Sequence, residues 1–255
     1  MDDHERSRQL RELLAIAGTH PIGLGSPRSR VHLTEGFNRR VLMIEQCVRL
    51  AEERADGAGG AALAPSEAAV LSLHVNAYWM HLCGALDNLA WALNYELALF
   101  PAANEETQGD RNKVALFGKS FMKVLTTAAP SLAIALRPNA SRYEELRRWR
   151  DPGAHRIPLC APPGVVNDAE AADLTGRYAE ADGILRGGDI DGGLELIVAA
   201  NAAVKYLPVV VVSSAGGLRT WPLLETMSRD QQTFADVARP VLEFLREPRV
   251  SESAV

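Results

Sequence analysis

The chain has 255 residues, of which 47% are apolar and 23% are charged, and its formal net charge is −5. These values are typical of one large or two small globular domains, and they exclude a chain that is disordered throughout. The acidic balance also excludes a protein that binds nucleic acid over its whole surface, because phosphate binding then requires a local cationic patch.

The N-terminal half is predicted to be helical. Apolar residues at helical spacing predict helices over 4–17, 34–55 and 65–100, with a loop from Thr19 to Leu33, which holds two prolines and two glycines. The third helix is apolar nearly all round, so we expect it to be long, central and buried. A polar stripe follows it nevertheless, because His74, His81 and Asn88 recur every seven residues and share one face. Each of these side chains requires a partner.

The rest of the chain is predicted to be helical apart from one hairpin. Helices are expected over 110–126, from Arg142 to about Arg150, from about 167 to 205 with a Gly-rich break at 187–193, and over 228–246. Pro152 is expected to end the second of these helices. Residues 208–214 and 218–221 flank Gly216-Gly217 and predict a β-hairpin. The fold class is therefore mainly α with one small C-terminal β-hairpin, and 249–255 is expected to be a flexible tail.

Cysteine usage and the first residues indicate a reducing compartment. Cys47, Cys83 and Cys160 include no Cys-x-x-Cys pair, and the start Met-Asp-Asp-His-Glu-Arg lacks the apolar segment of a secretory signal. A cytoplasmic protein is expected. The uncharged stretch 68–86 approaches the length of a membrane span, but its polar residues favour a buried helix, so no membrane association is expected.

The sequence contains no motif typical of a nucleotide-binding loop or of a metal site. Gly118-Lys-Ser120 lacks the upstream glycine of a P-loop, and Lys113 stands in its place. His74 and His81 would lie about 10 Å apart along a helix, too far to share one ion. We therefore expect no metal and no cofactor.

One cationic stretch contrasts with the acidic chain. Six arginines fall between Arg137 and Arg156, with Trp149 among them. Arginine binds phosphate oxygens in a bidentate manner, so the stretch is a candidate substrate-binding surface. The residues assigned to substrate binding are Arg147, Arg148, Arg156 and Trp149. The alternative is a solvated helix face in which the arginines pair with Glu144 and Glu145.

Within this stretch, Arg150-Asp-Pro-Gly-Ala-His155 combines a permanent cation with a side chain that titrates near neutral pH. These groups are sufficient for metal-free RNA cleavage: His155 would deprotonate the 2′-hydroxyl, and Arg150 would stabilise charge on the pentavalent phosphorus. Asp151 would orient one of them. The alternative is structural, with Arg150 bonded to a helix C-terminus and His155 capping a loop.

The Arg-x4-His spacing resembles that of the HEPN family. Ala85-Leu-Asp-Asn-Leu-Ala-Trp91 followed by Arg150-Asp-x-x-Ala-His-Arg-Ile-Pro-Leu159 is similar to bacterial HEPN-like proteins over about 35–165. The resemblance implies one HEPN-like helical domain over 1–248, with a core at 35–165 and C-terminal helices plus the hairpin at 166–248. It also implies a homodimer and, in many members, a metal-independent endoribonuclease of toxin or defence systems, with an antitoxin as protein partner. Pro152-Gly153 departs from the family pattern.

Three residues of the long helix are expected to support this site. Asp87, Asn88 and His81 are polar in a buried helix, and we expect Asp87 to pair with Arg150 or Arg156.

Three functions remain open: an endoribonuclease, a non-catalytic HEPN-like module that binds RNA, nucleotide or protein, and a small-molecule enzyme or metalloprotein that uses His74, His81 and Asp87.

Overall fold

The computed structural model describes residues 3–19, 24–57, 62–155, 157–162, 164, 168–202, 207–214 and 217–247. The predicted tail at 249–255 lies outside the described residues, as does Arg156. The chain falls into two compact units. Unit 1 comprises Met1–Val48, Asn76–Arg156 and Glu225–Val255, and unit 2 comprises Arg49–Val75 and Ile157–Leu224.

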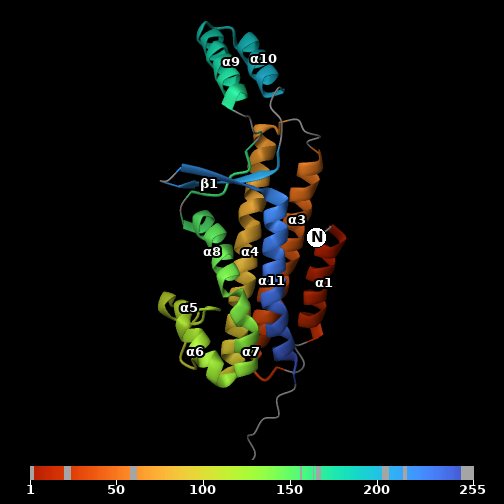
Figure 1. Ribbon diagram of the computed structural model, residues 1–255, viewed down its shortest axis with the longest axis vertical. Coiled ribbons are helices and arrows are strands. Elements are labelled where there is room, and N and C mark those ends of the chain that lie inside the picture. The colour runs from red at the N-terminus through yellow and green to blue at the C-terminus, as the bar shows by residue number, and fades with distance from the viewer. Residues whose placement is uncertain are drawn as a thin grey trace, which may run out of the picture. The chain divides into compact units, whose positions relative to one another are not determined.

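The fold is mainly α with one two-stranded antiparallel sheet near the C-terminus, as the sequence predicts (Figure 1). The helices of the first half are α1 (Asp3–Thr19), α2 (Pro27–Val31), the π-helix η1 (His32–Asn38), α3 (Arg39–Gly57) and α4 (Pro65–Leu97). Next come α5 (Gln108–Lys113), α6 (Lys119–Ala128), α7 (Pro130–Leu136), the 3₁₀ helix η2 (Arg137–Asn139) and α8 (Ala140–His155). The chain ends with α9 (Asp168–Arg186), α10 (Ile190–Ala202), β1 (Val209–Ser214), β2 (Gly217–Pro222) and α11 (Leu223–Arg246).

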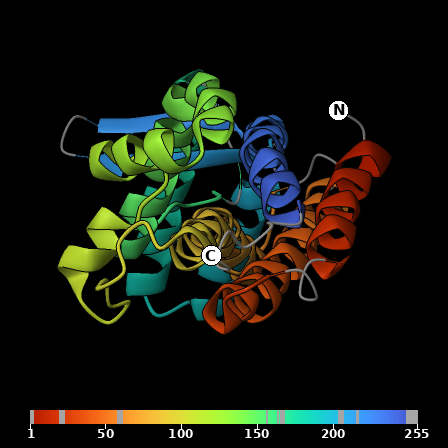
Figure 2. The same ribbon diagram turned by 90° about the horizontal axis from the view of Figure 1, so that it is seen from below.

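In unit 1, α3 and α11 lie alongside α4, and α1 lies against α3 and α11 (Figures 1 and 2). Buried aromatic residues of α4 anchor this packing. The Tyr78 hydroxyl donates to the Met227 carbonyl at 2.6 Å, and the Trp79 indole donates to Asp230 of α11 at 2.8 Å. The Trp79 ring also stacks on Trp149 of α8, with centroids 5.0 Å apart. The hydroxyl and indole are thus satisfied although both rings are buried.

The loop predicted over Thr19–Leu33 is wrong from Pro27 onward, because α2 and η1 occupy residues 27–38. Ser26 is the N-cap, and its side chain accepts a hydrogen bond from the Ser29 amide. Pro27 stands at the first helical position, where its missing N–H removes no helical hydrogen bond. A serine followed by proline therefore begins a helix here, whereas the density of proline and glycine favoured a loop.

The helix predicted over 110–126 is also wrong, because the chain breaks between α5 and α6. Phe117 has a φ of 64°, in the left-handed region that few non-glycine residues adopt. Its ring packs against the buried Tyr143 with centroids 4.8 Å apart. This tertiary contact accompanies the break and outweighs the helical spacing of the local sequence.

Helix α8 continues past Pro152 to His155, so the predicted end at Arg150 is wrong. A proline removes one backbone donor, and the helix continues for only three residues beyond it. Helix α11 likewise contains Pro240, and it begins at Leu223 rather than at the predicted Ser228. Arg150 and His155 therefore belong to one helix, although the side chain of His155 is not among those described.

Unit 2 contains the predicted hairpin and a pair of helices. In the hairpin, β1 pairs with β2 in a register that sets Val210 opposite Trp221. Cys160 adds a single antiparallel bridge to Val211, with N–O distances of 3.1 and 2.7 Å. Helices α9 and α10 pack closely at Gly193, where an added Cβ would lie 2.5 Å from Leu185.

Candidate functional site

The polar stripe predicted along α4 has partners at each position in unit 1, and it extends one step further to Tyr95. His81, Asn88 and Tyr95 are seven residues apart and contact Arg40, His32 and Glu105, respectively. These six residues are called the polar seam below. The expectation that this face requires partners is confirmed for His81 and Asn88, and the partners of the polar seam come from residues 32–40 and from the segment after α4.

At one end of the polar seam, Arg40 of α3 approaches His81. Arg40 Nη1 lies 3.3 Å from His81 Nδ1. A guanidinium only donates, so this nitrogen must accept, which requires a neutral imidazole. Burial lowers the pKa of His81, and the neighbouring charge of Arg40 lowers it further. The same guanidinium lies over Gly84, where an added Cβ would be 2.5 Å away.

At its middle, Asn88 bonds to His32, the first residue of the π-helix. Asn88 Nδ2 donates to the Gly84 carbonyl at 2.7 Å, which leaves Oδ1 to accept from His32 Nδ1 at 3.0 Å. His32 Nε2 lies 3.1 Å from Glu105 Oε1. Both ring nitrogens of His32 therefore face oxygen atoms of other side chains. π-Helical turns are frequent at functional sites.

At the other end, Tyr95 and Glu105 share a short hydrogen bond. The Tyr95 hydroxyl donates to Glu105 Oε1 at 2.5 Å. Burial, with the Glu105 carboxylate, raises the pKa of Tyr95 to about 12. The pKa of Glu105 is lowered: burial alone would raise it, but hydrogen bonds from Tyr95 and His32 outweigh burial. Arg28 lies over the Tyr95 ring at 5.3 Å from its centroid.

Two contacts dock α2 on α4 and so position Arg28 and His32. The Ser29 hydroxyl donates to the Ala92 carbonyl at 2.9 Å, and both groups are buried. Glu96 accepts hydrogen bonds from the amides of Gly25 and Ser26 at 2.9 and 3.2 Å. The segment before α3 is therefore held in place by polar contacts to α4.

Asp87, next to the polar seam, forms the predicted ion pair with Arg150. Arg150 Nη1 lies 3.4 Å from Asp87 Oδ2, and Arg150 Nε lies 3.4 Å from Asp151 Oδ1. Burial raises the pKa of Asp87 above its ordinary value. Three guanidinium groups oppose that rise, those of Arg150, Arg147 and Arg40. These three arginines with Asp87 and Asp151 are called the arginine cluster below.

The arginine cluster is partly exposed. The side chains of Asp87 and Arg150 are 41% and 25% exposed. Arg147 is 41% exposed and has a 3.9 Å contact with Glu144, which is weak for an ion pair. Counted with Glu144, three carboxylates accompany the three guanidinium groups, so the formal charges balance locally.

The remaining predicted residues are not gathered at this cluster. Trp149 is only 7% exposed and stacks in the core on Trp79, so its ring is not presented to a substrate. Arg148 is exposed on the outer face of α8. The side chain of His155 and all of Arg156 lie outside the described part of the chain. Sequence reasoning missed Arg40 and His32, whose partners are 41 and 56 residues away along the chain.

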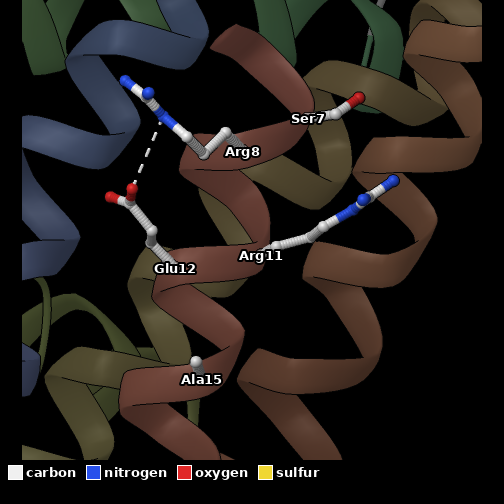
Figure 3. Close-up of a pocket in the computed structure, with 5 residues that line it drawn as sticks. All are labelled: Ser7, Arg8, Arg11, Glu12 and Ala15. Carbon is white, nitrogen blue, oxygen red and sulfur yellow. Dashed lines mark ion pairs between the residues drawn. The ribbon is translucent and has the colours of Figure 1, made fainter. Parts of the chain in front are cut away.

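Two open pockets in unit 1 are large enough to consider. One, of about 390 Å³, is lined by Ser7, Arg8, Arg11, Glu12 and Ala15, which all belong to α1 (Figure 3). Its charged groups form exposed ion pairs, Arg8 with Glu12 and Arg11 with Glu45. The other, of about 430 Å³, is lined by His32, Tyr95 and Glu105 of the polar seam, together with Arg28 and neighbouring residues. Only the second pocket brings titratable groups from several segments together.

The described residues contain neither a membrane-spanning helix nor a cluster of metal ligands. None of the helices they form combines the length and the apolar character needed to cross a membrane. Among the same residues, no group of three or more histidine, cysteine, aspartate or glutamate side chains is placed to hold a metal ion.

Comparison with known proteins gives no family for this chain. A scan of family models, a search of curated proteins and a search of solved structures each found no match.

Proposed function

We propose that the chain is a HEPN-like protein that binds the phosphates of RNA or of a nucleotide through the arginine cluster. The observation that carries this proposal is the contact of Arg150 with Asp87 at 3.4 Å, beside Arg147 and Arg40, whose charges also act on the Asp87 carboxyl. Partly exposed guanidinium groups on an acidic chain are suited to phosphate, because they bind its oxygens in a bidentate manner.

The two carboxylates fit this role as orienting groups. Asp87 and Asp151 each contact Arg150 at 3.4 Å, which limits the directions in which its guanidinium can point. The remaining N–H donors of a guanidinium stay free for a ligand, since it carries five. Contacts of this kind position a nucleic-acid backbone without reading its sequence.

Fluorescence anisotropy with a labelled single-stranded RNA tests this proposal. Binding should weaken as salt rises, and removing one arginine that binds a phosphate should reduce the slope of log Kd against log salt by about 0.7. The changes are Arg40→Ala, Arg147→Ala and Arg150→Ala, singly and together. Arg186→Ala is the matched control, because Arg186 is an exposed arginine of α9 that pairs with Asp182. Binding that is absent, or unchanged in the triple variant, would refute the proposal.

A second candidate, a metal-independent endoribonuclease, is favoured by the continuity of α8 through Pro152 to His155. His155 would take the proton of the 2′-hydroxyl, whose oxygen attacks phosphorus while Arg150 stabilises the charge. The 5′-oxygen leaves with a proton, so the products are a 2′,3′-cyclic phosphate and a 5′-hydroxyl. Positions five apart on a helix differ by about 140° in direction and about 7.5 Å in height, which favours pairing across a homodimer over pairing within one copy.

Incubation of mixed RNA with the purified protein in EDTA separates the two candidates. Cleavage should produce cyclic phosphate ends and disappear in His155→Ala and Arg150→Ala, while His74→Ala, in unit 2, should leave it unchanged. Light scattering of the same samples measures whether the active species is a dimer. RNA that binds at micromolar protein but stays intact would exclude the nuclease and retain the binding function.

A further inference from the structure

The pocket beside His32 contains charged groups of both signs. It measures about 430 Å³, within the range of about 300–1,000 Å³ typical of small-molecule sites. Arg28 and His32 line it from α2 and η1, Tyr95 from α4, and Glu105 and Glu106 from the segment that follows. It shares no residue with the arginine cluster, so the two are distinct candidate sites.

Glu105 is held ready to accept a further hydrogen bond. Its Oε1 atom receives the Tyr95 hydroxyl at 2.5 Å and His32 Nε2 at 3.1 Å, and His32 is itself fixed by Asn88. The lowered pKa of Glu105 means that it is ionised at neutral pH. No described residue bonds to its Oε2 atom, and 42% of the side chain is exposed. One oxygen therefore fixes the carboxylate, and the other is free for a ligand.

Arg28 supplies the opposite charge at the same pocket. Its guanidinium lies 5.3 Å from the centre of the Tyr95 ring and is close enough to Glu105 to lower the pKa of that carboxyl. The side chains of Pro27 and Val31 form an apolar edge of the pocket, and Val31 is 57% exposed. A cationic side chain, a fixed carboxylate and an apolar edge thus face one space.

We propose that this pocket binds a small zwitterion of the α-amino acid class. The ammonium group donates to Glu105 Oε2, with Glu106 adding negative charge, and the ligand carboxylate binds the Arg28 guanidinium. An apolar side chain of the ligand lies against Pro27 and Val31. A ligand with only one of the two charges leaves the opposite group of the pocket unpaired, and this penalty gives selectivity.

Titrations followed by NMR of the tryptophan indoles and by thermal unfolding test this proposal. The probe is leucine, and its matched analogues are isoamylamine, which lacks the carboxylate, and 4-methylpentanoic acid, which lacks the ammonium. Trp91 is the reporter, because His32 stacks on it at 6.2 Å. Leucine or another free amino acid should bind with a Kd of about 1 mM or tighter, and each analogue should bind at least about tenfold more weakly.

Two pocket variants and one control complete the experiment. Glu105→Gln and Arg28→Gln should each weaken binding about tenfold or more, because each removes a charge-assisted hydrogen bond. Glu45→Gln removes a carboxylate that pairs with Arg11 outside the pocket, and it should leave binding unchanged. Arg28 lies on a short surface helix, so its variant still tests the site if Glu105→Gln fails to fold. The proposal is overturned if no amino acid shifts the Trp91 signal, if isoamylamine binds as well as leucine, or if both pocket variants bind normally.

Discussion

Replacing Gly36 by alanine should destabilise the protein through one side chain, Asn88. A Cβ at position 36 would lie 2.0 Å from Asn88 Oδ1 and 2.4 Å from its Cγ, and the three nearest atoms all belong to that amide. Asn88 cannot move aside freely, because it holds two hydrogen bonds, to His32 and to the Gly84 carbonyl. The substitution must therefore break both bonds or displace the π-helix.

The expected magnitude follows from these two hydrogen bonds. At about 1 kcal/mol each, with a further penalty for the polar atoms left unpaired, Gly36→Ala should lower the free energy of unfolding by about 2–3 kcal/mol. Asn88→Ala removes the same bonds and should lower it by a similar amount. In the double variant the clash is absent, and alanine is preferred to glycine in a helix by about 1 kcal/mol. The double variant should therefore be no less stable than Asn88→Ala alone.

Urea unfolding of the wild type, the two single variants and the double variant measures this coupling, which we expect to be about 2–3 kcal/mol. Gly109→Ala is the control, because nothing lies within 4 Å of a Cβ added at that position. It should be neutral or slightly stabilising. If the effects of Gly36→Ala and Asn88→Ala add to within about 0.5 kcal/mol, the clash does not act through the Asn88 amide and the reasoning is refuted.

Three other predictions follow from the burial of individual side chains. Trp149→Ala should lower the free energy of unfolding by about 3–5 kcal/mol in chemical denaturation, because the ring is buried against Trp79; a surface-like effect below about 0.5 kcal/mol would contradict this. Burial raises the pKa of Asp230, so its contribution to stability should fall as pH rises above its ordinary pKa of 3.8. The Tm of the wild type minus that of Asp230→Asn should accordingly decline from about pH 4 to pH 7, and a rising difference would refute the assignment. A thiol reagent should label the exposed Cys160 quickly and spare the buried Cys83, whose pKa burial raises to about 12; equal rates in the folded protein would contradict the burial.

The parts of the fold that depend on local pattern were predictable. The long apolar run of α4, and the valine run 209–212 followed by Gly216-Gly217, each specify one element, and both elements are present. The recurrence of His81 and Asn88 also predicted a face that requires partners, and it has them. Spacing alone fixes which residues share a helix face.

The partners themselves could not be predicted, because they depend on how distant segments pack. His32 lies in a region rich in proline and glycine, which favoured a loop and concealed the π-helix. Arg40 belongs to an amphipathic helix with no unusual pattern, and only the packing of α3 on α4 brings it to His81. The end of α8 was missed because a proline usually ends a helix, whereas here the backbone continues to His155.

The polar seam also has a consequence for how α4 is turned about its own axis. A helix that is apolar nearly all round can bury several of its faces almost equally well, so apolar packing alone discriminates poorly between rotated arrangements. A rotation by one residue, about 100°, would carry His81, Asn88 and Tyr95 away from their partners. Each group left unpaired in the interior would cost about 1–3 kcal/mol. The polar contacts therefore select one orientation of the helix. That orientation sets where Asp87 and Tyr95 of α4 lie in the two ligand sites proposed for unit 1.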